Sequence, residues 1–312
     1  MNIDPLLAIA AFGIGIVVGL TGMGGGALMT PVLVLFFNVP PLTAVSSDLV
    51  ASAVMKPVGS VVHLRRGTVH LGLVKWLCIG SIPGAFSGVL VARSLGRGQE
   101  VQDAIRFALG IALLLAAVGL IVRAYIRLVE RARRRDGRAE PLPEGPPRVN
   151  LKVLPTILLG AVGGLVVGFT SVGSGSLIII ALMALYPTLT ANELVGTDLV
   201  QAVPLVASAA IGHILFGDFH MDLTTSLLVG CIPGVWLGAH LSARAPGGVV
   251  RRALAFVLLA SALKLLNVSN SKTALALAVV LVFAPLLWML VRRHHGFPAL
   301  ATRSPRKGNL PS

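Results

Sequence analysis

Eleven apolar runs follow one another along this chain, and most of them approach the length of a membrane-spanning helix. They lie at about 5–20, 24–37, 44–63, 72–94, 103–125, 152–170, 174–187, 191–215, 222–244, 250–267 and 273–291. The runs are continuous rather than alternating, which favours helices and excludes a β-barrel. The sequence therefore predicts an all-α polytopic membrane protein. The runs at 24–37 and 174–187 are short, which leaves open whether they cross the bilayer fully.

The charged residues support this class. Only 12% of the residues are charged, about half of the share in a soluble domain, while 55% are hydrophobic. The net charge of +14 comes from Lys and Arg in loops beside the apolar runs, which is the positive-inside pattern rather than a nucleic-acid surface. Cys78 and Cys231 lie within apolar runs and are expected to be buried thiols, neither metal ligands nor a disulfide. The N-terminus lacks the basic region of a cleavable signal peptide, so the first run is expected to remain as a span.

The two halves of the chain resemble each other. Ser47-Asp48-Leu49-Val50 matches Thr197-Asp198-Leu199-Val200, His63 matches His213, and Gly80-Ser81-Ile82-Pro83-Gly84 matches Gly230-Cys231-Ile232-Pro233-Gly234. Five segments per half would insert the second half upside down relative to the first. If the glycine-rich stretches were only kinks in longer helices, the halves would run parallel. The distribution of basic residues favours inversion.

The expected organisation has five parts: a first membrane repeat at 1–125, a basic cytoplasmic linker at 126–150, a second membrane repeat at 151–268, an extra transmembrane helix at 269–292, and a basic cytoplasmic tail at 293–312. Placing the basic loops inside gives a periplasmic N-terminus and a cytoplasmic C-terminus. Arg93, Arg97 and Arg106 then fall on the outer side, where they fit this orientation least well.

Each half contains one glycine-rich stretch that interrupts an apolar run: the first glycine stretch at 19–28 and the second glycine stretch at 168–177. Irregular backbone at membrane depth survives only where protein or a water-filled cavity satisfies it, and a matched pair of such breaks points to a transporter site. The helix starts that follow could hold an anion, although small residues also serve close helix packing. The candidate substrate-binding residues are Thr21, Gly24, Gly25, Gly26, Ser47, Lys56, Thr170, Ser171, Gly173, Ser174, Gly175 and Thr197.

Asp48 and Asp198 are ionisable residues within apolar sequence, which makes them candidates for proton coupling. Asp48, Ser52 and Lys56 are spaced four apart and would share one helix face, whereas the second half has Val206 in place of the lysine. The alternative is that each aspartate caps its helix near the membrane surface.

Other motifs indicate architecture rather than chemistry. His63 and His213 are expected at helix C-termini, where they oppose the helix dipole, and their spacing predicts no metal site. Gly80, Gly84 and Gly88, with their counterparts in the second half, are expected to be packing faces. The sequence contains neither a nucleophile–base arrangement nor a phosphate loop, which argues against an enzyme or a nucleotide-driven pump, and no cofactor is predicted.

In their order and duplication, the glycine stretches, Ser47-Asp48-Leu49, Thr197-Asp198-Leu199, the His-x-x-x-Gly elements and the Ile-Pro-Gly pieces resemble the TauE/SafE family over about residues 5–267. This resemblance implies a secondary transporter that moves sulfite, sulfoacetate or a related organosulfonate across a bacterial inner membrane. The residues on the family's motif positions are Gly24, Gly25, Gly26, Ser47, Asp48, Gly173, Gly175, Thr197 and Asp198.

Two other classes compete with a proton-coupled carrier of a small anion. One is a transporter or channel for a different solute such as a metal cation, although two lone aspartates and a lysine do not form an acidic ring. The other is a membrane enzyme or an assembly subunit. The expected partners are a small anionic substrate and the lipid bilayer, without nucleic acid, and a homo-oligomer is compatible with them.

Overall fold

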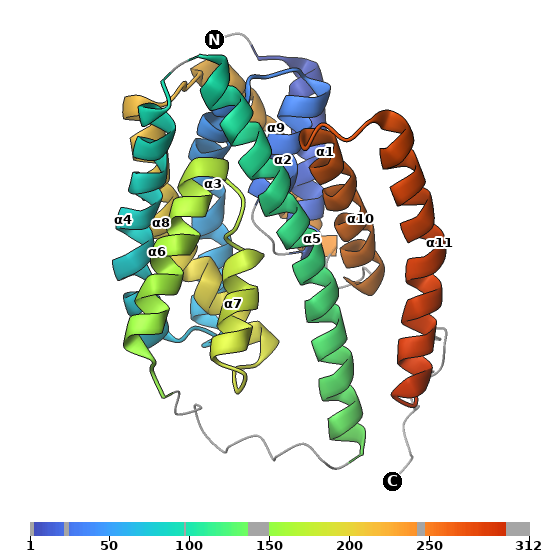
Figure 1. The fold of residues 1–312 in the computed structure, drawn as a ribbon. Helices are drawn as coiled ribbons and strands as arrows, with labels where there is room; N and C mark the ends of the chain where they lie inside the picture. Colours follow the sequence, from blue (N-terminus) through green and yellow to red (C-terminus); the bar gives the residue numbers. More distant parts are fainter. Residues whose placement is uncertain (1–2, 22–24, 97, 137–149, 242–246, 298–312) are drawn as a thin grey trace.

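The computed structural model describes residues 3–21, 25–96, 98–136, 150–241 and 247–297, and these ranges form eleven α-helices (Figure 1). The helices are α1 (Pro5–Thr21), α2 (Gly26–Phe36), α3 (Pro41–Arg65), α4 (Leu71–Ser94), α5 (Gln99–Arg135), α6 (Val153–Thr170), α7 (Leu177–Leu185), α8 (Ala191–Phe216), α9 (Met221–Leu241), α10 (Gly247–Leu265) and α11 (Asn270–His294). Within the described ranges, seven of them are long and apolar enough to cross a membrane. The prediction of an all-helical polytopic membrane protein is therefore confirmed.

Each glycine stretch lies between two helices, and the second helix of each pair runs back alongside the first. α2 has only 11 residues and α7 only 9, well short of the roughly 20 needed for a full span. The start of α6 meets the end of α7, since the backbone N–H of Lys152 donates to the Tyr186 hydroxyl at 3.0 Å. Leu7 at the start of α1 and Leu33 near the end of α2 likewise share one apolar cluster. Neither pair of helices is one continuous helix: α1 with α2, and α6 with α7, each form a helical hairpin, whose tip is described at Gly25–Gly26 in the first half and at Ser171–Ser176 in the second.

The two hairpins open at opposite ends of the fold. In Figure 1, α1 descends from the end that carries the N-terminus, whereas α6 rises from the other end. The longer arm of each hairpin packs along a helix of the other half: α6 lies against α4, and α1 lies against α9. Through these pairings the tips are brought to the middle of the fold.

Glycines make these two helix pairs close. A methyl group added to α4 would lie 2.0–2.4 Å from a backbone carbonyl oxygen of α6, and one added to α9 would lie 2.0–2.3 Å from one of α1. The glycines on α4 are Gly80, Gly84 and Gly88, and those on α9 are Gly230, Gly234 and Gly238. The backbones therefore touch directly at both pairings, and the expected packing role of these motifs is confirmed.

Gly80→Ala is expected to destabilise the protein. Its new methyl group would lie 2.0 Å from the Ile157 carbonyl oxygen, and rigid backbone cannot yield as a side chain can. Overpacking of this kind costs about 1–3 kcal/mol, which thermal unfolding in detergent would detect as a lower melting temperature. Gly13→Ala is the matched control, because nothing lies within 4 Å of its added methyl group. Equal melting temperatures for the two variants would contradict direct backbone contact.

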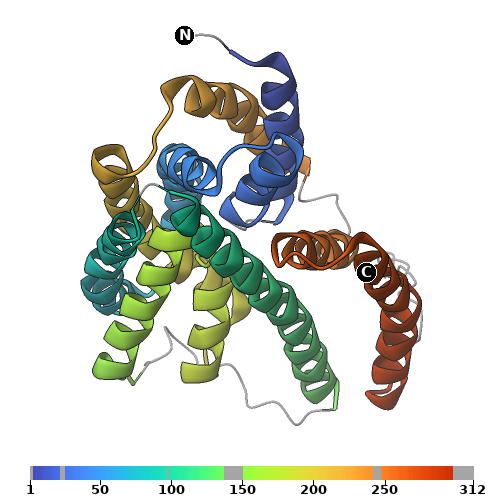
Figure 2. The ribbon, with the colours of Figure 1, turned by 45° about the horizontal axis from the view of Figure 1, so that its top comes forward.

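α5 is longer than the sequence predicted. The expected segment ended at 125 with a linker from 126, but the helix continues to Arg135. Arg135 donates to the backbone oxygens of Gly296 at 2.5 Å and His295 at 3.3 Å, so α5 and α11 end on the same side of the fold. α11 lies at the edge of the bundle beside α10 (Figure 2). Residues 137–149 of the expected linker and 298–312 of the expected tail lie outside the described residues.

Candidate substrate site

The two glycine stretches are in direct contact. A methyl group added at Gly26, the first residue of α2, would lie 2.1 Å from the backbone oxygen of Ser171 and 2.7 Å from its hydroxyl. Ser171 ends α6 in the left-handed region with φ 61°. The hairpin tip of one half thus contacts the hairpin tip of the other half. The contact is so close that there is no room for a side chain at Gly26.

Asp48 lies on α3 beside this contact and is fully buried. Its Oδ2 accepts hydrogen bonds from Thr30 of α2 at 2.8 Å and from Ser171 at 2.6 Å. One carboxylate therefore joins both hairpins to α3. The alternative prediction that the aspartates cap their helices is wrong, because α3 begins at Pro41 and α8 at Ala191, well before Asp48 and Asp198.

Asp198 on α8 holds the second glycine stretch. Its Oδ2 accepts the backbone N–H of Gly175 at 2.6 Å, and its Oδ1 accepts the side-chain amide of Gln201 at 3.0 Å. The amide oxygen of Gln201 in turn accepts the Ser81 hydroxyl at 3.1 Å, which orients the amide. Sequence reasoning missed Gln201, although its position three residues after Asp198 on one helix places the two side chains together.

Lys56 is the cation of this region. It is 7% exposed, its ammonium donates to the Ser174 hydroxyl, and it interacts electrostatically with both Asp198 and Asp48. Arg123 of α5, also buried, acts on Asp198. Two acidic and two basic groups therefore balance one another in the interior, as buried charges require.

Several buried oxygen atoms near the two stretches lack a hydrogen-bond partner among the described residues. They are Ser47 Oγ, Asp48 Oδ1, Ser52 Oγ and Ser176 Oγ. Leaving such a group unpaired costs about 1–3 kcal/mol, so each of these atoms calls for a ligand or a water molecule. In addition, α2 and α7 both begin without a side-chain cap. A small polar solute could be bound by this combination of groups: hydroxyls, a carboxyl group, an ammonium and two uncapped helix starts.

Other predicted site residues use their polar groups within their own helix or loop. Thr21 and Thr170, at matching positions, donate to the carbonyl oxygens of Val17 at 2.8 Å and Val166 at 2.7 Å, one turn back in their own helices. Gly173 has φ 141°, a conformation that favours glycine, and therefore shapes the second tip. Gly24 lies outside the described residues.

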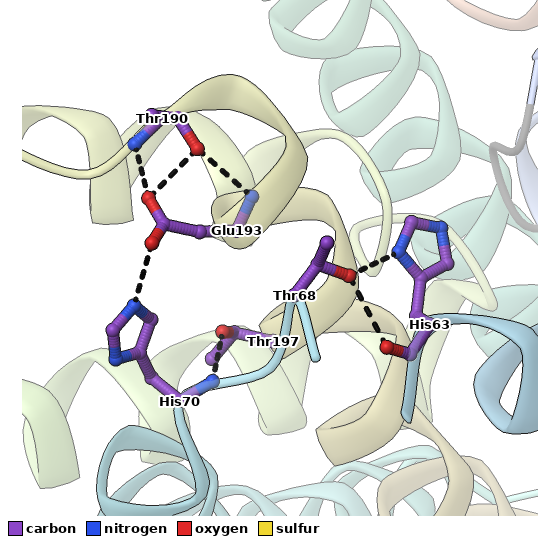
Figure 3. A network of polar contacts seen from close by, with 6 residues as sticks. All are labelled: His63, Thr68, His70, Thr190, Glu193 and Thr197. Carbon is purple, nitrogen blue, oxygen red and sulfur yellow. Dashed lines mark hydrogen bonds and ion pairs between the residues drawn. The ribbon is translucent and has the colours of Figure 1, made fainter. Parts of the chain in front are cut away.

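Thr197 belongs to a network at one end of the fold (Figure 3). Its hydroxyl accepts the backbone N–H of His70 at 3.1 Å. The His70 ring contacts Glu193 at 3.2 Å, and Glu193 forms a capping box with Thr190 at the start of α8. The network fastens the α3–α4 turn to α8, so the Thr197 hydroxyl already has a backbone partner.

The paired histidines do lie in the last turns of their helices, as predicted. His63 contacts the Thr68 hydroxyl at 2.9 Å within the network of Figure 3. His213 is fully buried, with one ring nitrogen 2.8 Å from the Gly168 carbonyl oxygen and the other 2.8 Å from Ser46 Oγ. His213 therefore connects α8 to α6 and α3, a role that its position in the sequence did not reveal.

A cavity of about 490 Å³ lies among the starts of α3 and α5 and the ends of α4 and α8, and its lining includes no residue of the two glycine stretches. Its wall includes Arg93, whose guanidinium lies 4.4 Å from the centre of the Phe216 ring, together with Gln102 and Asp218. At the glycine contact itself, the side chains of Thr30, Asp48 and Ser171 are all buried.

Comparison with known proteins supplies the remaining findings. The family model described as "Sulfite exporter TauE/SafE" matches residues 7–265. "Probable membrane transporter protein YjnA" of Bacillus subtilis (strain 168) is 39% identical over 254 residues, covering 81% of this chain and 96% of that protein. "Probable membrane transporter protein YdhB" of the same organism is 27% identical over 254 residues, covering 80% and 94%. No solved structure matches.

Proposed function

Because this chain belongs to the TauE/SafE family and is a membrane transporter of that type, we propose that it carries a small sulfur-containing anion across the bacterial inner membrane. The substrate class is sulfite, sulfoacetate or a related organosulfonate. The observation that carries the proposal is the contact of Gly26 with Ser171 beside Asp48, where two uncapped hairpin tips meet in the interior.

The proposed transport unit consists of two inverted repeats of five helices, with α11 as an addition. Two observations support it: the hairpins open at opposite ends, and equivalent glycines pack α4 on α6 and α9 on α1. Basic residues support a cytoplasmic position for the end where α5 and α11 finish, since Arg65, Arg135, Arg292 and Arg293 all end helices there. The N-terminus would then be periplasmic.

The chemistry of the interior suits an oxyanion. Lys56 offers a positive charge, Ser52 and Ser176 offer unpaired hydroxyls, and the starts of α2 and α7 carry the positive ends of their dipoles. The carboxylates of Asp48 and Asp198 would repel an anion unless a proton accompanied it. This opposition is the physical reason to propose proton coupling through one or both aspartates.

Flux of labelled sulfite into proteoliposomes tests this function. We expect uptake that responds to an imposed pH gradient and is inhibited by sulfonates but not by divalent metal salts. Flux of a labelled divalent metal in place of sulfite would instead support the competing cation transporter. Sulfite flux that ignores the pH gradient would retain the anion substrate and remove proton coupling.

A further inference from the structure

Asp48 and Asp198 occupy matching positions, but their hydrogen-bond partners differ in kind. Both oxygens of Asp198 accept N–H groups, from the Gly175 backbone and from the Gln201 amide. An N–H group can only donate, so protonation of Asp198 would replace two charge-assisted hydrogen bonds with weaker neutral ones, and neither partner could accept the new proton. Asp198 is therefore built to remain a carboxylate that holds the second hairpin tip.

The hydrogen-bond partners of Asp48 differ from those of Asp198, because they are hydroxyls. Its Oδ2 accepts from two hydroxyls, those of Thr30 and Ser171, while its buried Oδ1 has no partner among the described residues. Ser52 Oγ, 2% exposed, likewise has no hydrogen bond of normal geometry among the described residues, although it lies close enough to the Asp48 carboxyl group to interact with it. A proton on Oδ1 would therefore displace no existing hydrogen bond.

The two unpartnered atoms face the same space. A methyl group added at Gly25 would lie 3.8 Å from Asp48 Oδ1 and 3.9 Å from Ser52 Oγ. Gly25 is the residue that precedes α2, and it brings no side chain into this space. The nearest atom to that methyl group is Met55 Cε at 3.4 Å, so the space lies between an uncapped helix start, a hydroxyl, a carboxyl oxygen and a flexible methionine side chain that must move aside for a larger group.

We propose that Asp48 and the transported anion bind one proton together: the anion occupies the space beside Gly25 while Asp48, protonated at Oδ1, donates a hydrogen bond to it. This inference rests on the proposed function and assigns its coupling to Asp48 rather than Asp198. Ser52 and the start of α2 supply the other donors. Lys56 lies one turn further along α3 from Ser52 and supplies a positive charge. Protonated Asp48 is neutral and no longer competes with the anion for this charge.

The charged and titratable groups around Asp48 agree with this assignment. On its own helix it faces Lys56, and from α9 it faces the Cys231 thiol. Among the described residues, α2 contributes the Thr30 hydroxyl and the tip after α6 contributes the Ser171 hydroxyl, and Asp198 of α8 acts on the same Lys56. Two carboxylates thus share the positive charge of Lys56. When Asp48 is protonated, that charge interacts with Asp198 and with the anion.

The test measures the affinity of the purified, detergent-solubilised protein for ethanesulfonate by thermal shift and calorimetry. A sulfonate is used because its charge stays constant with pH, unlike that of sulfite. Titrations run from about pH 5 to about pH 9, a range that includes the titration of buried carboxyl groups in proteins. If one proton binds with each anion, wild-type affinity falls by up to about tenfold for each unit of rising pH.

Asp48→Asn mimics the protonated carboxyl group, so its affinity is expected to be independent of pH. Asp198→Asn, at the matching position, is expected to keep the wild-type slope at an altered affinity, because its one amide oxygen can hold only one of the two N–H groups. A slope that persists in Asp48→Asn would assign the proton to another group, Lys56 included, and overturn the proposal. Should Asp48→Asn fail to fold, Asp48→Glu, which keeps an ionisable carboxyl group, is expected to move the midpoint of the pH profile without removing the slope.

The possible failures are distinguishable. Ethanesulfonate binding with a flat wild-type profile overturns the role of Asp48 and leaves the anion carrier intact. Folded wild-type protein that binds neither ethanesulfonate nor sulfite at any pH overturns the proposed function, and the role of Asp48 with it.

Discussion

Gly26→Ala is expected to reduce anion transport on the order of 100-fold, the loss that a displacement of about 1 Å produces at a preorganised site. The added methyl group would lie 2.1 Å from the backbone oxygen of Ser171 and 2.9 Å from its carbonyl carbon, so the two hairpin tips must separate. Separation would also pull the Ser171 hydroxyl away from Asp48, which it contacts at 2.6 Å. Flux into proteoliposomes measures the effect, with the melting temperature recorded in parallel.

Gly25→Ala is a control for folding only, because its methyl group would enter the space assigned to the anion. The nearest atom to its methyl group is Met55 Cε at 3.4 Å, an ordinary contact with a flexible side chain, and Gly25 has φ −58°, which alanine adopts readily. We expect Gly25→Ala to fold and melt like the wild type. Wild-type flux through Gly26→Ala would show that the contact between the tips is not needed for transport.

The helices were largely predictable because each apolar run is bounded by charge, glycine or proline. The predicted run at 44–63, for example, became α3 at Pro41–Arg65. α5 was the exception: its last turns are rich in Arg and read as a solvated linker, yet arginine is a good helix former and the helix continued to Arg135. Hydropathy located the membrane segments, whereas helix propensity extended one of them beyond the apolar run.

The site was predictable only in part. The sequence pattern identifies which residues are unusual, but it does not show which of them are in contact in the folded protein. The spacing of Asp48, Ser52 and Lys56 correctly put them on one face of α3. That Ser171 would bind Asp48 and that Ser174 would bind Lys56 depends on how the second hairpin meets the first, and no spacing within either half encodes it. For the same reason Thr197, which matches Ser47 in sequence, obtained a backbone partner that Ser47 lacks.

The asymmetry between the halves has a physical consequence. Lys56 stands where the second half has Val206, so one lysine serves two matching aspartates, and Arg123 of α5 acts on Asp198 as well. Together with Arg123, this single lysine balances the two aspartates, and its charge remains open to competition from an incoming anion.

Lys56→Met is therefore expected to damage both stability and binding. Methionine preserves the apolar stem but leaves Asp48 and Asp198 buried without this cation. Removing one partner of a buried charge pair costs about 3–5 kcal/mol, so a large fall in melting temperature is expected. Sulfite and ethanesulfonate affinity should fall on the order of 100-fold or more, since a charge-assisted partner is lost. Lys264→Met, which removes an exposed lysine from α10, should change neither quantity.

Adding Asp198→Asn to Lys56→Met separates the two effects. The double variant no longer buries that uncompensated charge, so part of the lost stability should return, and the Asn oxygen can still accept the Gly175 N–H. Anion affinity should not return with it, because the cation is still missing. A double variant that regains both stability and affinity would show that Lys56 only neutralises Asp198, and Lys56→Met with unchanged affinity would remove the lysine from the site altogether.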